Sequence, residues 1–117
     1  MKLLPLKPQI RFNDVEKLDV RVGTITRVSD IPESEKLVML SVDFGEFTRT
    51  IVVGMKQERD DPTEITGQQA LFIVNLEPKV IMGIESEGML FDIGYANEIT
   101  PVLAQPEKAV PNGVSAG

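Results

Sequence analysis

The chain has 117 residues, 42% of them apolar and 26% charged, a composition typical of one folded globular domain. It contains no cysteine and no histidine, which excludes disulfides, zinc fingers and nucleophiles activated by an imidazole base. The net charge of −6 is uneven, because residues 1–57 carry nine basic and eight acidic side chains, whereas residues 58–117 carry three and ten. A polyanion site would therefore draw on the first half of the chain together with Lys79.

Residues 1–13 are expected to form an arm, because Pro5 and Pro8 limit regular structure. Asn13 and Glu16 have the spacing of a capping box, which predicts one helical turn at the end of the arm. The apolar start of the chain is interrupted too early for a signal peptide or a membrane span, so we expect a cytoplasmic protein that does not contact a membrane.

The first predicted strand begins at Val20 and places alternate apolar and β-branched residues on one face as far as Val28, with Gly23 as a candidate bulge. A loop at 29–36 leads to two strands, Leu37 to Phe44 and Phe47 to Val53, which are separated by two residues and predict a hairpin.

A helix start follows, with Asp61 as the cap, a proline at the first helical position and Gly67 at the end. The apolar run from Ala70 to Leu76 predicts a central strand, and shorter strands are expected at Met89 to Ile93 and Ile99 to Leu103. A turn is expected at 111–113.

This order of elements predicts an all-β fold, a five-stranded OB-fold Greek-key barrel with a short helix between strands three and four. We expect it to comprise residues 14–117, including a C-terminal extension. An SH3-like barrel would also accommodate the strands, but it would not explain the helix.

Two enzyme motifs are approximated by the segment from Gly83 to Gly88, and both fail. The serine in it lacks the spacing of a nucleophile elbow and any histidine base, and Met89-Leu90 stand where a phosphate-binding loop needs Lys and Ser or Thr. The acidic pairs lack metal-ligand spacing. We therefore expect a protein that is not an enzyme and that needs no metal or cofactor.

The segment Asn75 to Met89 has the pattern N-L-x-P-x-x-x-x-G-x-x-S-x-G-M. This pattern resembles the signature of the tRNA-binding OB-fold domain family, which includes free-standing dimeric proteins and the C-terminal domain of some methionyl-tRNA synthetases. Leu18 to Gly23, Ser34 to Leu37 and Thr50 to Gly54 are also similar to the family, in the same order, so the resemblance covers about residues 12–114.

The resemblance implies a homodimer that binds the outer corner of tRNA by shape and backbone contacts, with an aminoacyl-tRNA synthetase as a further expected partner. The residues that it assigns to RNA binding are Lys36 and Lys79 for phosphates, Asn75 and Ser86 for ribose or base, Met89 for an unstacked base, and Arg21 as a weaker candidate. Apolar residues of the arm and of the later strands are expected at the subunit interface, namely Ile10, Phe12, Ile99, Val102 and Leu103.

Each RNA-binding assignment has a structural alternative. Lys36 would then be a solvated loop lysine, Asn75 a turn cap, Ser86 a turn hydroxyl and Met89 a core residue, and Arg21 would pair with an acid. The acidic residues around the signature, which include Glu77, Glu85, Glu87 and the acids at 58–61, weaken attraction to phosphate, so we expect weak or selective RNA binding.

A second functional hypothesis comes from a branch of the same fold that contains dimeric CsaA-type secretion chaperones. Asp43 to Gly45 and the tail from Gln105 to Gly113 are similar to that branch. A chaperone for unfolded polypeptides would need an exposed apolar groove and no phosphate contacts, which suits the negative charge. The signature segment nevertheless favours tRNA binding over the chaperone role.

Overall fold

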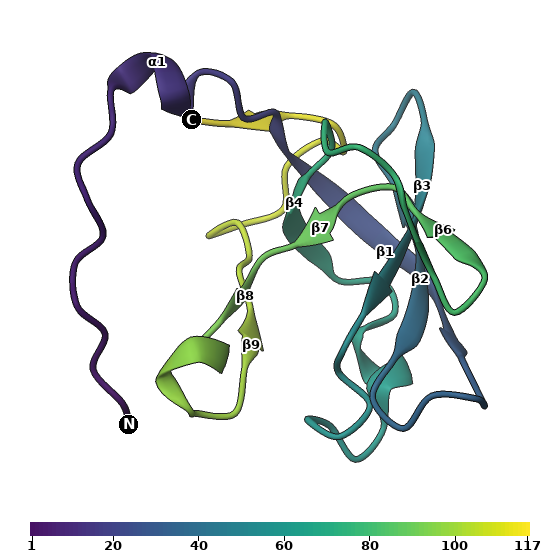
Figure 1. The fold of residues 1–117 in the computed structure, drawn as a ribbon. Coiled ribbons are helices and arrows are strands. Elements are labelled where there is room, and N and C mark those ends of the chain that lie inside the picture. The colour runs from purple at the N-terminus through teal and green to yellow at the C-terminus, as the bar shows by residue number, and fades with distance from the viewer.

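The computed structural model describes residues 1–117 and consists mainly of strands. Its principal sheet has the order β3-β2-β1-β4-β7 and curls into a nearly closed barrel (Figure 1). The five strands along this path are β1 (Val20–Asp30), β2 (Val38–Asp43), β3 (Thr48–Val53), β4 (Gln69–Ile73) and β7 (Met89–Leu90), and a sixth strand, β10 (Ser115–Ala116), pairs with β1 alone. The predicted five-stranded all-β barrel is therefore confirmed. None of the helices is long and apolar enough to cross a membrane.

Smaller elements surround this barrel. They are α1 (Phe12–Val15), the 3-10 helix η1 (Pro62–Ile65), β5 (Lys79–Ile81), β6 (Ile84–Ser86), β8 (Asp92–Ile93), the 3-10 helix η2 (Tyr95–Asn97), β9 (Val102–Leu103) and β10 (Ser115–Ala116). The pairs β5–β6 and β8–β9 form two-stranded sheets, and β10 pairs with β1.

The predicted helix between strands three and four is present as η1. The Asp61 carboxylate accepts a hydrogen bond from the backbone N–H of Thr63 at 3.0 Å and another from its hydroxyl, and these bonds lower the pKa of Asp61. Gly67 has a φ of 88°, a conformation that favours glycine, and it ends the turn.

The barrel interior is filled by aliphatic side chains around two phenylalanines. Phe44, at the end of the β2–β3 hairpin, meets Phe72 of β4 edge to face, with 5.4 Å between ring centroids. Ile25, Leu40 and Ile51 are fully buried beside them. The core is therefore mainly aliphatic, in a chain of which only 5% is aromatic, and Phe44 and Phe72 bring β4 into contact with the end of β2.

The first strand does not keep one apolar face toward the core, because Ile25 and Val28 both pack there. Ile25 lies in the core, on the opposite face from Val22, and the ladder to β2 shifts register between Ile25 and Arg27. Val22 is also buried, and its backbone N–H donates to the carbonyl of Val114 while its carbonyl accepts from the N–H of Gly113. The C-terminal segment therefore pairs alongside the start of β1, a long-range contact that local periodicity cannot reveal.

Two further boundaries differ from the sequence-based expectations. Met89 to Ile93 is split between β7 and β8, which belong to different sheets. The first helical turn is capped by Arg11, whose backbone N–H donates to the Asp14 carboxylate at 3.1 Å, so Asn13 is not the cap. Both errors arise because a short apolar run and a capping pair each fit more than one boundary.

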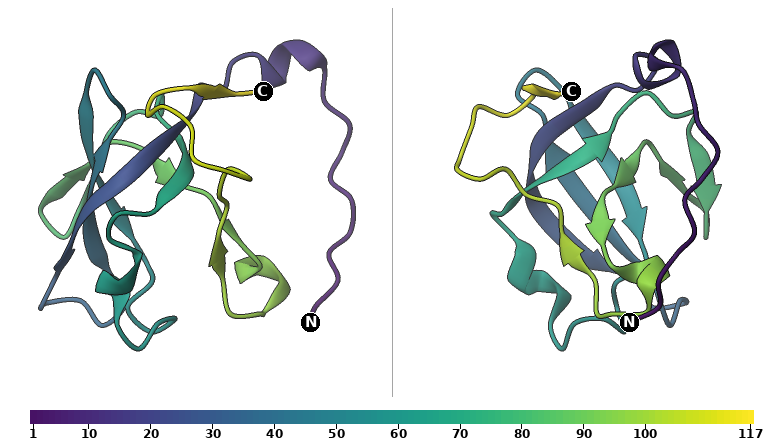
Figure 2. Two further views of the ribbon diagram at one scale, coloured as in Figure 1. Left: turned by 180° about the vertical axis from the view of Figure 1, so that it is seen from behind. Right: turned by 90° about the vertical axis from the view of Figure 1, so that its left-hand side faces the viewer.

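The N-terminal arm runs as an extended segment beside the barrel and ends near η2 (Figure 2). Lys2 and Asn97 hold it there through two hydrogen bonds of 2.8 Å, from the Lys2 N–H to the Asn97 carbonyl and from the Asn97 amide to the Lys2 carbonyl. Its apolar side chains are exposed, with Leu6 entirely so.

Candidate nucleic-acid interface

The signature segment is hydrogen-bonded to β3 through the residues at the end of β6. The Ser86 hydroxyl oxygen accepts a hydrogen bond from the backbone N–H of Val52 at 3.0 Å, and Ser86 is 5% exposed. One residue later, the Glu87 carboxylate accepts from the N–H of Thr50 at 3.0 Å, and the Glu87 N–H donates to the Thr50 carbonyl at 2.8 Å. We call this set of contacts the seam.

The seam changes the electrostatic role of Glu87. Its carboxylate also lies 3.6 Å from the guanidinium of Arg49, so its charge is partly offset within the protein. The sequence-based expectation that Glu87 opposes a phosphate therefore applies less to this residue than to Glu77 and Glu85, which form no ion pair. Gly88 completes the seam, because a Cβ there would come within 2.7 Å of the Ile73 carbonyl oxygen.

A groove of about 430 Å³ lies beside the seam, and we call it the signature groove. Lys79 and Ile81 of β5 form one wall, Ser86 and Met89 contribute from the signature, and the end of β3 completes it. Its remaining lining is largely apolar. Met89 is 41% exposed, which makes it available to a ligand rather than part of the core.

A second groove of about 420 Å³ adjoins the first, and we call it the Lys36 groove. It is lined by Lys36, Leu37, Gly54, Gln57, Glu58, Asp92 and Tyr95. Gly54 and Asp92 border both grooves. Neither Lys36 nor Lys79 forms an ion pair, so both ammonium groups are free to meet an anion.

Four of the six predicted RNA-binding residues thus line two connected grooves: Lys36, Lys79, Ser86 and Met89. The other two are engaged elsewhere. The Asn75 side-chain oxygen accepts from the N–H of Asp19 at 2.9 Å, and its amide nitrogen donates to the Lys17 carbonyl at 2.7 Å. Asn75 therefore holds the segment before β1 against the end of β4, a structural use of both polar atoms.

Arg21 pairs with Asp19, which immediately precedes its strand. Its guanidinium donates to both carboxylate oxygens of Asp19, at 2.9 and 3.1 Å, and lies 5.7 Å from the ring centroid of Phe47. The hydrogen bond and the charge of Asp19 raise the pKa of Arg21. Arg21 lines neither groove.

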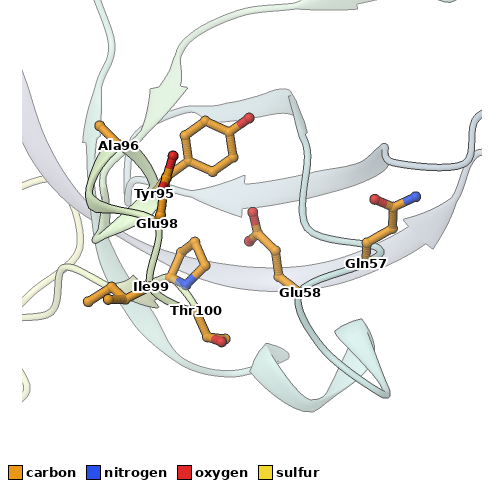
Figure 3. Close-up of a pocket in the computed structure, with 8 residues that line it drawn as sticks. Gln57, Glu58, Tyr95, Ala96, Glu98, Ile99 and Thr100 are labelled. Atoms are coloured by element: carbon orange, nitrogen blue, oxygen red, sulfur yellow. The ribbon is translucent and has the colours of Figure 1, made fainter. Parts of the chain in front are cut away.

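A third groove, of about 620 Å³, continues from the Lys36 groove along η2, and we call it the η2 groove (Figure 3). Glu58 extends into it from the wall opposite Tyr95 and Ile99. Partial burial and the neighbouring charge of Asp92 raise the pKa of Glu58. Glu58 also lines the Lys36 groove, and Asp92 borders both grooves that hold a lysine, so acidic side chains lie beside Lys36 and Lys79 as well.

Sequence reasoning missed the seam role of Glu87, the η2 groove and Lys56. The Lys56 ammonium donates to the carbonyls of Ile31 and Ser34, which lie 25 and 22 residues earlier in the chain. A local pattern carries no signal for contacts at that separation. No group of three or more acidic side chains lies close enough to hold a metal ion.

Comparison with known proteins gives a consistent result. A family model described as a tRNA binding domain matches residues 20–115. Methionine–tRNA ligase of Bacteroides fragilis is 44% identical over 112 residues, which is 96% of this chain and 16% of the ligase. The ligase of Pyrococcus horikoshii is 38% identical over 104 residues, 89% of this chain and 14% of the ligase. The chain thus spans a small part of these curated relatives.

Solved structures agree in fold over nearly the whole chain. A protein related to methionyl-tRNA synthetase from Pyrococcus horikoshii superimposes with a TM-score of 0.86 and 32% identity, covering 95% of this chain and 100% of that one. The chaperone CsaA from Bacillus anthracis str. Ames has a TM-score of 0.80 and 30% identity, covering 94% and 100%.

Proposed function

Because the chain belongs to the tRNA binding domain family, we propose that it binds tRNA through the signature and Lys36 grooves. The observation that carries this proposal is the placement of two unpaired lysines, Lys36 and Lys79, on one connected surface that also holds Ser86 and Met89. Ammonium groups at such positions attract phosphates, and an exposed methionine offers an apolar contact to an unstacked base.

We propose further that the ligand is the outer corner of tRNA, recognised by shape and backbone. The two side chains expected to contact ribose or base are already engaged, because the Ser86 oxygen accepts from Val52 and both polar ends of Asn75 are used. Contacts to phosphate and ribose follow the shape of folded RNA without demanding a sequence.

A titration of bulk tRNA followed by fluorescence anisotropy at about 50 and 150 mM salt tests the proposal. Lys36→Ala/Lys79→Ala should weaken binding about tenfold or more at the lower salt. It should also reduce the slope of log affinity against log salt concentration by the equivalent of about two phosphate contacts. The matched control is Lys108→Ala, which removes one exposed charge from a different part of the surface, bordered by Gln69 and Gln105. Equal losses for Lys108→Ala and either groove lysine would contradict the proposed site.

We also propose a homodimer in which the arm and the later strands meet a second copy. Four of the apolar side chains expected at the interface are between 44% and 74% exposed: Ile10, Phe12, Ile99 and Val102. Apolar side chains that a second subunit covers in the dimer would be exposed in this way in a single subunit. Leu103 instead packs against the core, so it is a weaker interface candidate than the other four. A synthetase is the proposed protein partner, on the basis of the similarity to methionine–tRNA ligases.

The second candidate function is that of a chaperone for unfolded polypeptides. The similarity to CsaA favours it, as does the largely apolar lining of the signature groove. Suppression of the aggregation of a chemically denatured model protein, at an equal number of subunits, would measure this activity. Strong suppression together with no tRNA binding at about 50 mM salt would reverse the order of the two proposals.

A further inference from the structure

The loop between β1 and β2 is wrapped around a single ammonium group. The Lys56 Nζ atom donates to the carbonyl oxygens of Ile31 at 2.8 Å and Ser34 at 2.7 Å, and it also forms an ion pair with Asp30. Two of the three ammonium hydrogens are therefore donated to carbonyls of one loop, and the charge faces Asp30 at the end of β1. The side chain is 24% exposed, so these bonds are partly shielded from water.

Other contacts of the same loop lead directly to Lys36. Ile31 is buried, and the Ser34 hydroxyl accepts from the N–H groups of Lys36 at 3.2 Å and Leu37 at 3.0 Å. The backbone N–H of Lys56 donates to the Lys36 carbonyl at 3.0 Å. Lys56 therefore contacts the loop twice, through its side chain at the start and through its backbone at Lys36.

The two carbonyl contacts, rather than the ion pair, are the important ones. Asp30 is 64% exposed on its side chain, and ion pairs with exposed partners contribute little. The carbonyls belong to a turn in which the N–H of Ser34 donates to the carbonyl of Ile31 at 2.9 Å. Without the ammonium, the Ser34 carbonyl loses a partner that β1 and β2 do not replace, and the turn loosens.

We propose that Lys56 is a positioning residue that orders the loop at 31–36 and thereby holds Lys36 in its groove toward tRNA phosphate. This inference rests on the proposed tRNA binding. Lys56 itself points into the loop rather than at the ligand, because its ammonium donates to two loop carbonyls and pairs with Asp30. The Lys36 side chain, by contrast, is exposed and unpaired.

The first experiment uses the free protein and needs no RNA. Amide hydrogen exchange is compared between the wild type, Lys56→Met, Lys56→Arg and Asp30→Asn. Both Lys56 variants should raise exchange over residues 31–37 at least about threefold, because methionine has no donor and the longer, planar guanidinium spreads its donors over several atoms instead of presenting them from one. Asp30→Asn keeps both carbonyl contacts and should leave the loop protected.

The second experiment measures tRNA affinity at about 50 mM salt. Lys56→Met and Lys56→Arg should each weaken binding about three- to tenfold, the scale of one lost phosphate contact. Lys56→Arg keeps the charge, so its loss isolates geometry. In a Lys36→Ala background the same substitutions should cost less than about twofold, because the group they position is gone.

The outcomes separate this proposal from the one on which it rests. Unchanged exchange in both Lys56 variants, or an affinity loss that persists in full without Lys36, would overturn the positioning role while leaving tRNA binding intact. Failure of the wild type to bind tRNA would overturn the proposed function and, with it, the role of Lys56 toward RNA. If Lys56→Met does not fold, the charge-conserving Lys56→Arg decides the question.

Discussion

Glu58 is the residue at which the electrostatics of the surface oppose its proposed ligand. Its carboxylate borders both the Lys36 groove and the η2 groove, and its pKa is raised above the ordinary value of 4.5 by partial burial and by Asp92. The folded protein therefore holds this proton more firmly than the unfolded chain does. The stability that depends on the proton is complete below pH 4.5 and is lost as the pH rises through the raised pKa.

Glu58→Gln should therefore make the protein more stable than the wild type at neutral pH, with the difference vanishing in acid. Denaturant unfolding across this pH range measures it. The same variant should bind tRNA about two- to threefold more tightly at about 50 mM salt, because a like charge beside Lys36 is gone. Glu107→Gln is the control for net charge, and an equal gain there would contradict a local effect of Glu58.

Ser86 is the residue at which structure and proposed function meet. Ser86→Ala removes the acceptor of the buried Val52 N–H and should lower the free energy of unfolding by about 1–3 kcal/mol, measured by urea denaturation. Ser86→Thr keeps the hydroxyl and should lose less. If Ser86→Ala were as stable as the wild type, the seam would not be a source of stability. The role of Ser86 would then be confined to the signature groove that it lines.

Among the elements, β1 depends most on a single glycine. A Cβ at Gly23 would lie 2.6 Å from Val42 Cγ1 and 2.7 Å from Phe44 Cε1, so the strand passes directly over the core. Gly23→Ala should cost about 1–3 kcal/mol of stability through overpacking. Gly54→Ala is the matched control, because its nearest contact would be 3.8 Å away. Thermal unfolding of the two variants compares them, and equal midpoints would contradict the close approach.

The elements also show which features a sequence can predict. The β2–β3 hairpin and η1 were correct because their signals are local: a two-residue link between alternating strands, and a capping aspartate before a proline. The register shift in β1 and its pairing with the C-terminal segment were not predicted, because neither a bulge nor a contact with the far end of the chain leaves a local signal. The candidate site follows the same division, since the groove residues come from local motifs, whereas Lys56 and the seam depend on distant contacts.

At the scale of the whole molecule, the N-terminal arm is an exposed apolar surface that a second subunit could cover. The arm is held by two hydrogen bonds to Asn97, and its leucines face water. Light scattering at micromolar concentration should give the mass of two chains. Phe12→Asp/Val102→Asp should give the mass of one, because charge at both apolar positions opposes burial. A wild-type monomer, or a dimeric double variant, would contradict the proposed interface.

The charge asymmetry also acts at this scale. Acidic side chains dominate residues 58–117. Lys36 and Lys79 nevertheless lie in grooves that are lined by residues of both halves of the chain. A polyanion is therefore attracted at one place and repelled over much of the remaining surface. This pattern favours a single binding orientation and a steep dependence on salt.

The seam has a consequence for the behaviour of the protein at high concentration. A strand at the end of a sheet normally presents free N–H groups with which a strand of another molecule can pair, and aggregation begins there. On β3, two of those groups, at Thr50 and Val52, are already bonded to the side chains of Glu87 and Ser86. The segment that shapes the groove thus also protects the β3 edge from intermolecular β-pairing, without extending the sheet by another full strand.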